Sequence, residues 1–235
     1  GVKNIAIISA RCRSKRILKK NIKNFLGKPI ISYSIELAIK SNIFDKIIVS
    51  TDDEEIAKVA IECGAEVPFL RPKNISDDFS GVHSVVDHAV RWLIDHGDVV
   101  NNVCCLFATA PLIAQDDLLE SLVKLKTGKW ESVVAAAEFS SPIFRAFKYI
   151  ENGGIEMFFP KYYSSRSQDL PISMYDAGQF YWATSKTCMA PPKGFSKNST
   201  ALIIPSWRVQ DIDTIEDWKR AEIIYKLIQE ENQIK

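Results

Sequence analysis

The sequence predicts an α/β fold built on a doubly wound, mostly parallel sheet. Short, continuous apolar runs at residues 5–8, 47–49 and 103–107 are typical of strands that are buried on both faces. Segments with helical periodicity separate these runs, at the spacing of strand–helix–strand units with right-handed crossovers. The 235 residues are enough for one substantial core with a small insertion, so we expect a single domain over 1–235.

The expected elements alternate along the chain. A helix entered through Pro29 follows the first strand, and a helix that ends at Gly64 follows the second. The remaining predictions are a short strand at 66–70, a helix at 82–96, a helix at 115–127 and strands at 132–137, 174–184 and 201–204. A last helix begins at the N-cap Thr214. Gly178 lies inside the predicted strand 174–184, where a glycine often allows a ligand or a second backbone to approach.

An aromatic segment interrupts this alternation at about residues 139–173. Turn signals and eight closely spaced Phe and Tyr residues predict small β-hairpins with exposed apolar surface. Such a surface indicates a subunit interface. A lid that packs on its own domain is the alternative.

Composition excludes several classes of protein. The net charge of +1 argues against a surface for nucleic acid or for a membrane, and no apolar run is long enough to span a bilayer. The N-terminus lacks the apolar region of a signal peptide, so a cytoplasmic location is expected. The five cysteines are scattered and include no C-x-x-C pair, which indicates reduced thiols and neither disulfides nor a zinc site.

Positive charge is concentrated in the loop after the first strand. Seven of the thirteen residues from Arg11 to Lys23 are basic, and no acidic residue precedes Glu36. The loop is neither a Walker A motif nor a G-x-G-x-x-G turn, yet its place after a buried strand suits polyphosphate. Arg11, Ser14, Lys15 and Lys20 are the candidate phosphate ligands. A solvated basic face and a nucleic-acid arm remain alternatives.

Asp211 and Asp213 form a second candidate site. In an extended segment, residues i and i+2 point to the same face, so the two carboxylates converge. Paired carboxylates suit Mg²⁺, although two acids before a helix also serve as a cap. A basic loop and an acid pair together are what nucleotidyl transfer needs. No G-x-S-x-G elbow, histidine triad or Cys/His pair is found, which disfavours covalent catalysis.

Motifs over nearly the whole chain resemble those of the sugar-acid cytidylyltransferases. They are residues 8–21, a variant of the family's A-R-x-x-S-K-R loop, together with 48–57, 69–72, A-T-A-P at 108–111, 166–169, D-A-G-Q-F-Y-W at 176–182 and Q-D-I-D-T at 210–214. The D-A-G-Q-F-Y-W and A-T-A-P motifs are most similar to the branch that activates pseudaminic acid, an acidic nine-carbon sugar.

The resemblance implies a fold of the nucleotide-diphospho-sugar transferase type and a dimerisation insertion. It also implies that the anomeric hydroxyl of the sugar attacks the α-phosphorus of CTP in line and expels pyrophosphate, with Mg²⁺ as the cofactor. The catalytic residues would be Lys20, Asp211 and Asp213, the last two as metal ligands. The nucleotide would contact Ala10, Arg11, Arg13, Ser14, Lys15, Lys20, Asn21, Arg71 and Ser80, and the sugar Thr109, Arg145, Arg166, Gln179 and Tyr181.

The chain departs from this pattern after Arg11, where Cys12 and Arg13 replace a pair of glycines that is usual in the pseudaminic branch. Two other functions therefore stay open. The chain could activate another sugar acid, such as sialic, legionaminic or 3-deoxy-octulosonic acid, or it could be a degenerate homologue that binds nucleotide without turnover.

Overall fold

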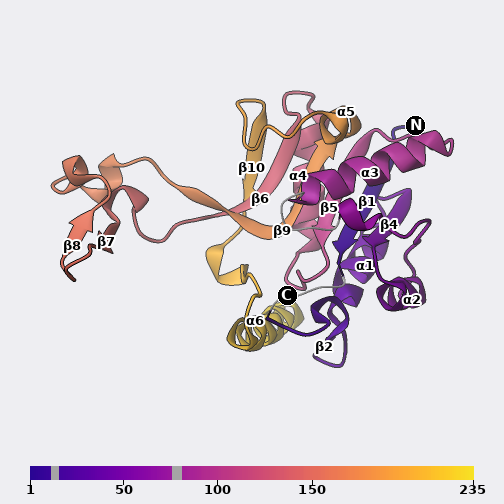
Figure 1. Ribbon diagram of the computed structural model, residues 1–235, viewed down its shortest axis with the longest axis horizontal. Coiled ribbons are helices and arrows are strands. Elements are labelled where there is room, and N and C mark those ends of the chain that lie inside the picture. Colours follow the sequence, from indigo (N-terminus) through magenta and orange to yellow (C-terminus); the bar gives the residue numbers. More distant parts are fainter. Residues whose placement is uncertain (12–15, 76–80) are drawn as a thin grey trace.

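The computed structural model describes residues 1–11, 16–75 and 81–235, and its centre is a six-stranded sheet with the order β10-β6-β9-β5-β1-β4 (Figure 1). The strands are β1 (Asn4–Ala10), β4 (Lys46–Thr51), β5 (Asn102–Phe107), β6 (Ser132–Glu138), β9 (Met174–Thr184) and β10 (Ser199–Ile203). β1 is parallel to β4 and β5, and β6 is parallel to β10, whereas β9 is antiparallel to both β5 and β6. The predicted mostly parallel sheet is confirmed.

Helices cover both faces of the sheet, so the fold is doubly wound. One face packs against α1 (Ile30–Ser41), α2 (Glu54–Glu62) and α4 (Gln115–Lys126), and the other against α3 (Gly81–Asp95) and α5 (Ser185–Met189). Within β1, Ala6 and Ile8 belong to the first core and Ile5 and Ile7 to the second. This two-sided burial explains the continuous apolar run of that strand. Among the described helices, none is both long and apolar enough to cross a bilayer.

The expected strand at 66–70 is wrong. Only Glu66 pairs with the sheet, through an isolated parallel bridge to Ile48. Pro68 has no N–H to continue the ladder, which accounts for the early end of the pairing. The short helix α5 was not predicted from the sequence.

The C-terminal helix packs against the segment that follows the basic loop. This segment contains the 3₁₀ turn η1 (Lys20–Ile22) and the hairpin of β2 (Asn24–Phe25) and β3 (Lys28–Pro29), and it meets α6 (Ile215–Ile234). Phe25, Tyr33, Ile212 and Trp218 form a separate buried cluster there. Through this cluster, the segment after the basic loop packs against the start of the C-terminal helix. The other 3₁₀ turns are η2 (Lys73–Ile75), η3 (Ile143–Arg145), η4 (Pro160–Tyr162), η5 (Ser167–Asp169) and η6 (Ser206–Arg208).

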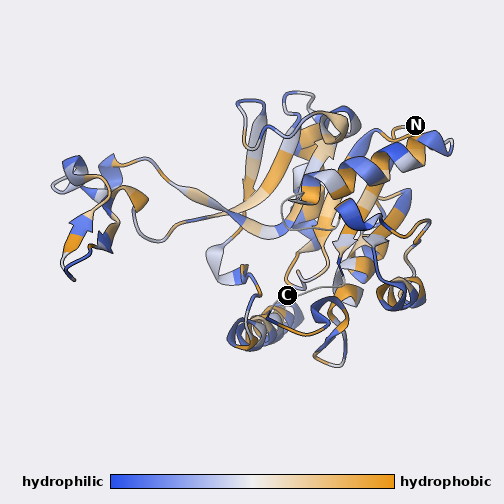
Figure 2. Ribbon diagram, in the orientation of Figure 1, coloured by the Kyte–Doolittle hydropathy of each residue, from blue (hydrophilic) through white to orange (hydrophobic). Residues whose placement is uncertain are grey.

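Residues 139–173, between β6 and β9, form an arm that projects away from the sheet (Figure 1). The arm contains one antiparallel pair, β7 (Phe147–Tyr149) and β8 (Ile155–Met157). Apolar positions alternate with polar ones along it (Figure 2), and Phe147, Tyr149 and Ile155 are more than 60% exposed. The predicted hairpin is confirmed, and its apolar surface does not pack on the body of this chain.

Candidate active site

The candidate site lies where the parallel strands end. Because β1, β4 and β5 run in the same direction, Ala10 pairs with Thr51 and Ser9 pairs with Phe107 at one edge of the sheet. The loops that start with Arg11, Asp52 and Ala108 therefore leave from neighbouring points. In open α/β sheets, this carboxyl edge is where ligands bind.

The basic loop is described at its two ends. The side-chain nitrogen Nδ2 of Asn21 donates a hydrogen bond to the carbonyl of Arg11 at 2.6 Å, which closes the loop on itself. Lys19 has a left-handed backbone with φ of 50° and forms an ion pair with Glu55 at 3.0 Å. Four predicted ligands, Arg13, Ser14, Lys15 and Ser80, lie outside the described residues.

Arg71 is buried beneath this edge, with only 3% of its surface exposed. Its backbone N–H donates to the carbonyl of Thr51 at 2.7 Å, and its Nη1 donates to Ser9 Oγ at 3.2 Å. Burial lowers the pKa of Arg71, as does the charge of Arg11, whereas Asp52 acts in the opposite direction. Arg71 thus lies with Arg11 and the end of β1, and these are among the residues that the resemblance assigns to the nucleotide.

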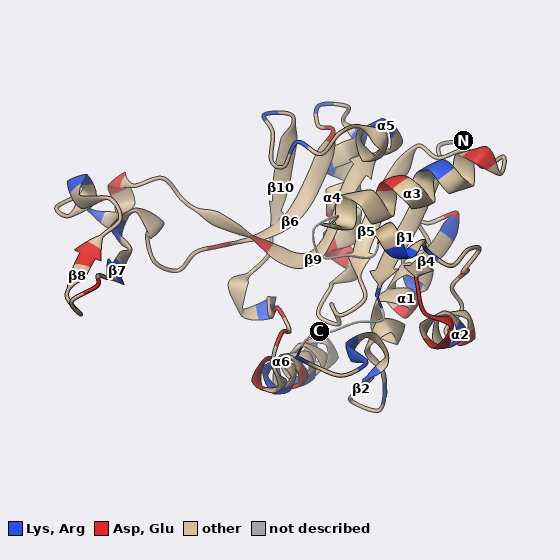
Figure 3. Ribbon diagram, viewed as in Figure 1, with Lys and Arg blue, Asp and Glu red and all other residues tan. Residues whose placement is uncertain are grey.

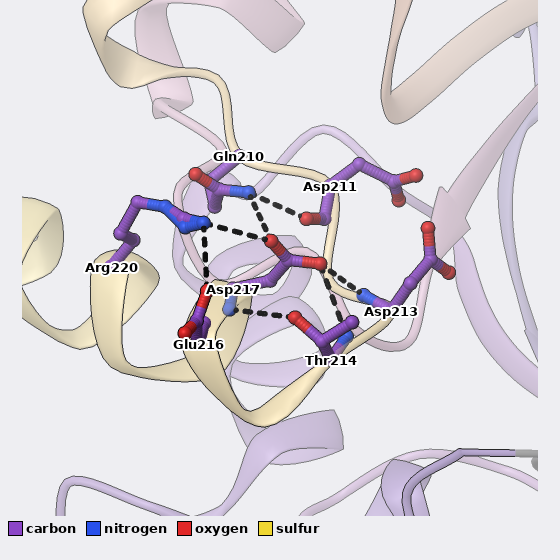
Figure 4. Close-up of polar contacts among 7 residues, drawn as sticks. All are labelled: Gln210, Asp211, Asp213, Thr214, Glu216, Asp217 and Arg220. Carbon is purple, nitrogen blue, oxygen red and sulfur yellow. Dashed lines mark hydrogen bonds and ion pairs between the residues drawn. The ribbon is translucent and has the colours of Figure 1, made fainter.

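The acid pair is far from the basic loop in the sequence but close to its end in space. The carboxyl groups of Asp211 and Asp213 project to the same side of their segment (Figure 4), and Lys20 Nζ lies 3.9 Å from Asp213 Oδ1. In Figure 3, the basic positions before β2 lie close to the acidic positions at the start of α6. Burial raises the pKa of Asp211, and so does the neighbouring carboxyl of Asp213, while Lys20 opposes the rise.

The first turn of α6, the helix that follows, fixes the backbone at the acid pair. Thr214 caps α6 in a reciprocal box with Asp217, and Asp217 Oδ2 accepts hydrogen bonds from the N–H groups of Asp213 and Thr214, each at 3.0 Å (Figure 4). These bonds lower the pKa of Asp217. Ile212, between the two acids, is 1% exposed and belongs to the buried cluster that contains Phe25 and Trp218. Thr214 and Asp217 therefore make the cap, and the carboxylates of Asp211 and Asp213 are not part of it.

A bulge in β9 lies against the acid pair. Asp176 pairs with Ala136 and Tyr181 pairs with Val134, so the four residues between them in β9 oppose Ala135 alone in β6. Gly178, in the bulge, has a φ of +67°, and a Cβ built there would lie 3.8 Å from Asp211 Oδ1. The group that lies next to Gly178 is therefore the side chain of Asp211, and the expected approach of a ligand or a second backbone stays a prediction.

The predicted sugar-binding residues fall into two groups. Thr109 lies on the loop after β5, and Gln179 and Tyr181 lie on β9, where Gln179 follows Gly178. Gln179 is 3% exposed and donates from Nε2 to the carbonyl of Arg208 at 3.1 Å, while its Oε1 has no hydrogen-bond partner among the described residues. Tyr181 pairs with the buried Cys105 across the ladder of β5 and β9, and burial raises the pKa of its phenol.

Arg145 and Arg166 form the second group, and both are on the projecting arm. Each is exposed, and Arg166 Nε pairs with Asp169 on the arm itself at 3.1 Å. Figure 1 shows the arm pointing away from the carboxyl edge of the sheet. A single copy of the chain, in this conformation, does not bring these two arginines together with the other predicted residues.

The acid pair fits a divalent cation of the hard, oxygen-seeking kind. Two carboxylates in contact repel one another, and a cation between them would remove the repulsion that raises the pKa of Asp211. Among the described residues there is no group of three or more His, Cys, Asp or Glu side chains that could hold a metal. A cation here would therefore complete its shell with water and substrate phosphates, which is what Mg²⁺ does in such sites.

A doubly wound sheet with a basic loop after its first strand, facing an acid pair, defines a nucleotidyltransferase. Residues 5–150 match the family described as cytidylyltransferase, and the chain belongs to this family. It is 47% identical to "Pseudaminic acid cytidylyltransferase" of Campylobacter jejuni, over 96% of this chain and 97% of the relative. It is 31% identical to "CMP-N,N'-diacetyllegionaminic acid synthase" of Legionella pneumophila, again over 96% and 97%.

A solved structure supports the fold. CMP:2-keto-3-deoxy-manno-octonic acid synthetase, in complex with CTP, superposes with a TM-score of 0.70 over 97% of this chain and 99% of that chain, at 16% identity. The predicted family and fold type are confirmed.

Proposed function

We propose that the chain transfers the cytidylyl group of CTP to pseudaminic acid and thereby makes CMP-pseudaminic acid and pyrophosphate. The anomeric oxygen of the sugar forms a bond to the α-phosphorus, the bond from this phosphorus to the β-phosphate oxygen breaks, and the hydroxyl proton is released. The 47% identity to a relative of that name, over nearly the full length of both chains, is the observation that supports the substrate most strongly.

The carboxyl edge of the sheet supports the nucleotide end of this reaction. Asn21 donates a hydrogen bond to the carbonyl of Arg11, and the buried Arg71 donates one to Ser9 at the end of β1. These bonds hold Arg11, Asn21 and Arg71 at this edge. We propose that they hold the cytidine, and that Lys20 binds the triphosphate with the loop residues. Donors and charges that are already in place need no reorganisation when negative charge moves onto the pyrophosphate.

Asp211 and Asp213 would hold Mg²⁺ in the proposed reaction. When bound, the cation would neutralise phosphate charge and polarise the α-phosphoryl group. The support is the chemistry of the donor set, since the two carboxylates converge beside Lys20 and next to the backbone of Gly178. This arrangement leaves room on the open side of the pair for phosphate oxygens and water.

A cavity on the α3 face of the sheet has a size that suits the sugar acid. It has a volume of about 540 Å³, lies between α3, β9 and the loop after α5, and is bordered by His83, Asp176, Tyr181, Lys193 and Phe195, among others. Its volume is in the range of sites for small molecules. Asp176 borders this cavity and also the hollow that contains Asp211. We propose that the sugar acid binds here, and His83 and Lys193 are residues that the sequence did not indicate.

We also propose that the arm, residues 139–173, forms a homodimer interface. Its exposed Phe147, Tyr149 and Ile155 have no cover within the chain. Replacing both Phe147 and Ile155 with Ser should convert a dimer to a monomer in light scattering coupled to gel filtration. Val123→Ser, at a position on α4 that is 66% exposed, is the matched control and should leave the mass unchanged. A wild-type monomer would refute this proposal.

The activity is tested by incubation with CTP, Mg²⁺ and, separately, pseudaminic, legionaminic, sialic and 3-deoxy-octulosonic acids, with pyrophosphate release as the readout. We expect the fastest release with pseudaminic acid. Faster release with another acid would reassign the substrate, and no release with any of them would favour a protein that binds nucleotide without turnover.

A further inference from the structure

Arg208 joins the segment that carries Asp211 to two other parts of the fold. Its Nη1 donates to Asp117 Oδ2 at 3.2 Å, in the first turn of α4. Its carbonyl accepts the hydrogen bond from Gln179 Nε2, in the bulge of β9. The side chains of Arg208 and Asp117 are 17% and 13% exposed, so solvent screens this ion pair little.

These contacts lie directly upstream of the acid pair. Next to Arg208, Val209 packs against the first core. The remaining anchors lie within or after the acid pair, because Ile212 is buried between the acids and Asp217 binds the N–H groups of Asp213 and Thr214. Gln179 also follows Gly178, whose backbone faces the Asp211 carboxylate. The bond from Gln179 to Arg208 therefore fixes the spacing between the bulge and Asp211.

We propose that Arg208 is a positioning residue, which holds Asp211 in place for the reaction through Asp117 and Gln179. The inference rests on the proposed function of the acid pair. Without the guanidinium, Asp117 is left as a shielded charge without its partner, and the turn at residues 206–208 loses its contact with α4. The segment before Asp211 then keeps only the bond from Gln179 to the Arg208 carbonyl and the packing of Val209, and the Asp211 carboxylate can turn away from Asp213.

The test compares Arg208→Gln, Asp117→Asn and the double variant with Lys46→Gln. Lys46 forms an ion pair with Asp98 at 2.9 Å, at the amino end of β4 and thus away from the carboxyl edge, which makes it a matched control. We expect the Arg208 and Asp117 variants to lower kcat by about 10–100-fold, as loss of a partner of a metal ligand usually does. The KM for CTP should stay within about threefold, because the nucleotide contacts are untouched.

Two further readouts separate positioning from general destabilisation. Hydrogen exchange over residues 206–214 should be faster in the Arg208 and Asp117 variants, and unchanged in Lys46→Gln. The double variant should be no worse than either single one, because both remove the same contact. Arg208→Lys, which retains the charge, should recover part of the lost kcat and serves as the test if Arg208→Gln does not fold.

A folded Arg208 variant with wild-type kcat, or with wild-type exchange over 206–214, would overturn the proposal. An equal loss of kcat in Lys46→Gln would also overturn it, because the effect would then not be local. If the wild-type protein shows no turnover, the proposed function fails, and the exchange experiment still decides whether Arg208 holds the segment.

Discussion

Lys20 Nζ lies 3.9 Å from Asp213 Oδ1 and so joins the basic loop after the first strand to the acid pair before the last helix. Lys20 is mostly covered, with 18% of its side chain exposed, whereas Asp213 is 58% exposed. The lysine also acts against the rise in the pKa of Asp211. Lys20 therefore acts on both carboxylates and also lies beside the loop that is proposed to bind phosphate.

Replacing Lys20 with Gln should lower kcat/KM for CTP by about 100-fold, the size of the effect when one charge-stabilising donor is lost. Lys19→Gln is the matched control, because the neighbouring Lys19 points to Glu55 instead of the acid pair. Steady-state kinetics of both variants provide the measurement. Equal losses in the two would mean that Lys20 contributes only to the overall charge of the loop.

Asp211→Asn should abolish turnover and yet stabilise the metal-free protein at neutral pH. The pKa of Asp211 is raised in the folded state by burial and by Asp213, so the folded protein binds the proton more tightly than the unfolded chain does. The ionised carboxylate then destabilises the fold above its pKa, and this cost disappears as the pH falls through that pKa.

Thermal melts of both proteins in a chelator, from pH 7 down to pH 4, check this prediction. The Tm of Asp211→Asn should exceed that of the wild type at pH 7, and the gap should narrow toward pH 4. A variant that is less stable than the wild type at pH 7 would show that the carboxylate is favourably bound in the metal-free protein.

Gly178→Ala should lower both stability and turnover. A residue with a Cβ at a φ of +67° costs about 1–2 kcal/mol. The new methyl group would lie 3.8 Å from Asp211 Oδ1, so a backbone shift that relieves the strained φ would move the bulge relative to this carboxylate. Gly128→Ala is the control, because Gly128 has a φ of +76° and open space around it. Urea melts should show similar losses in the two variants, and only Gly178→Ala should lose kcat by more than its loss of folded protein.

Thr214→Ala should destabilise the protein by about 1 kcal/mol, the usual value for the loss of a helix N-cap. The side chain of Thr214 accepts a hydrogen bond from the N–H of Asp217 at 3.1 Å, and this bond fixes the first turn of α6. Thr214→Ser keeps the oxygen and should retain most of the stability. If both variants melt with the wild type in urea, the capping box contributes nothing measurable.

The sequence was sufficient for much of the fold and for part of the site. Buried strands and amphipathic helices have local patterns, and the glycine within β9 and the threonine before α6 have local geometric roles. The convergence of Asp211 and Asp213 also follows from their spacing. The family motifs supplied Arg71, whose burial under β1 no local pattern indicated.

Other features depend on contacts between distant parts of the chain. Pro68 could be read from the sequence, but the number of residues in 66–70 that pair with the sheet depends on the neighbouring strand β4. The contacts of Arg208 with Asp117 and Gln179 join residues that are 91 and 29 positions apart. Arg145 and Arg166 lie on the arm, and their distance from the acid pair within one chain is a matter of how the arm projects.

The most direct test of the central claim is a competition for limiting CTP. The protein, with Mg²⁺, is given equal concentrations of pseudaminic, legionaminic and sialic acids, and the CMP-linked products are identified by mass spectrometry. We predict that CMP-pseudaminic acid is the main product and that Asp211→Asn forms none. A different main product, or none at all from the wild-type protein, would contradict the proposed function.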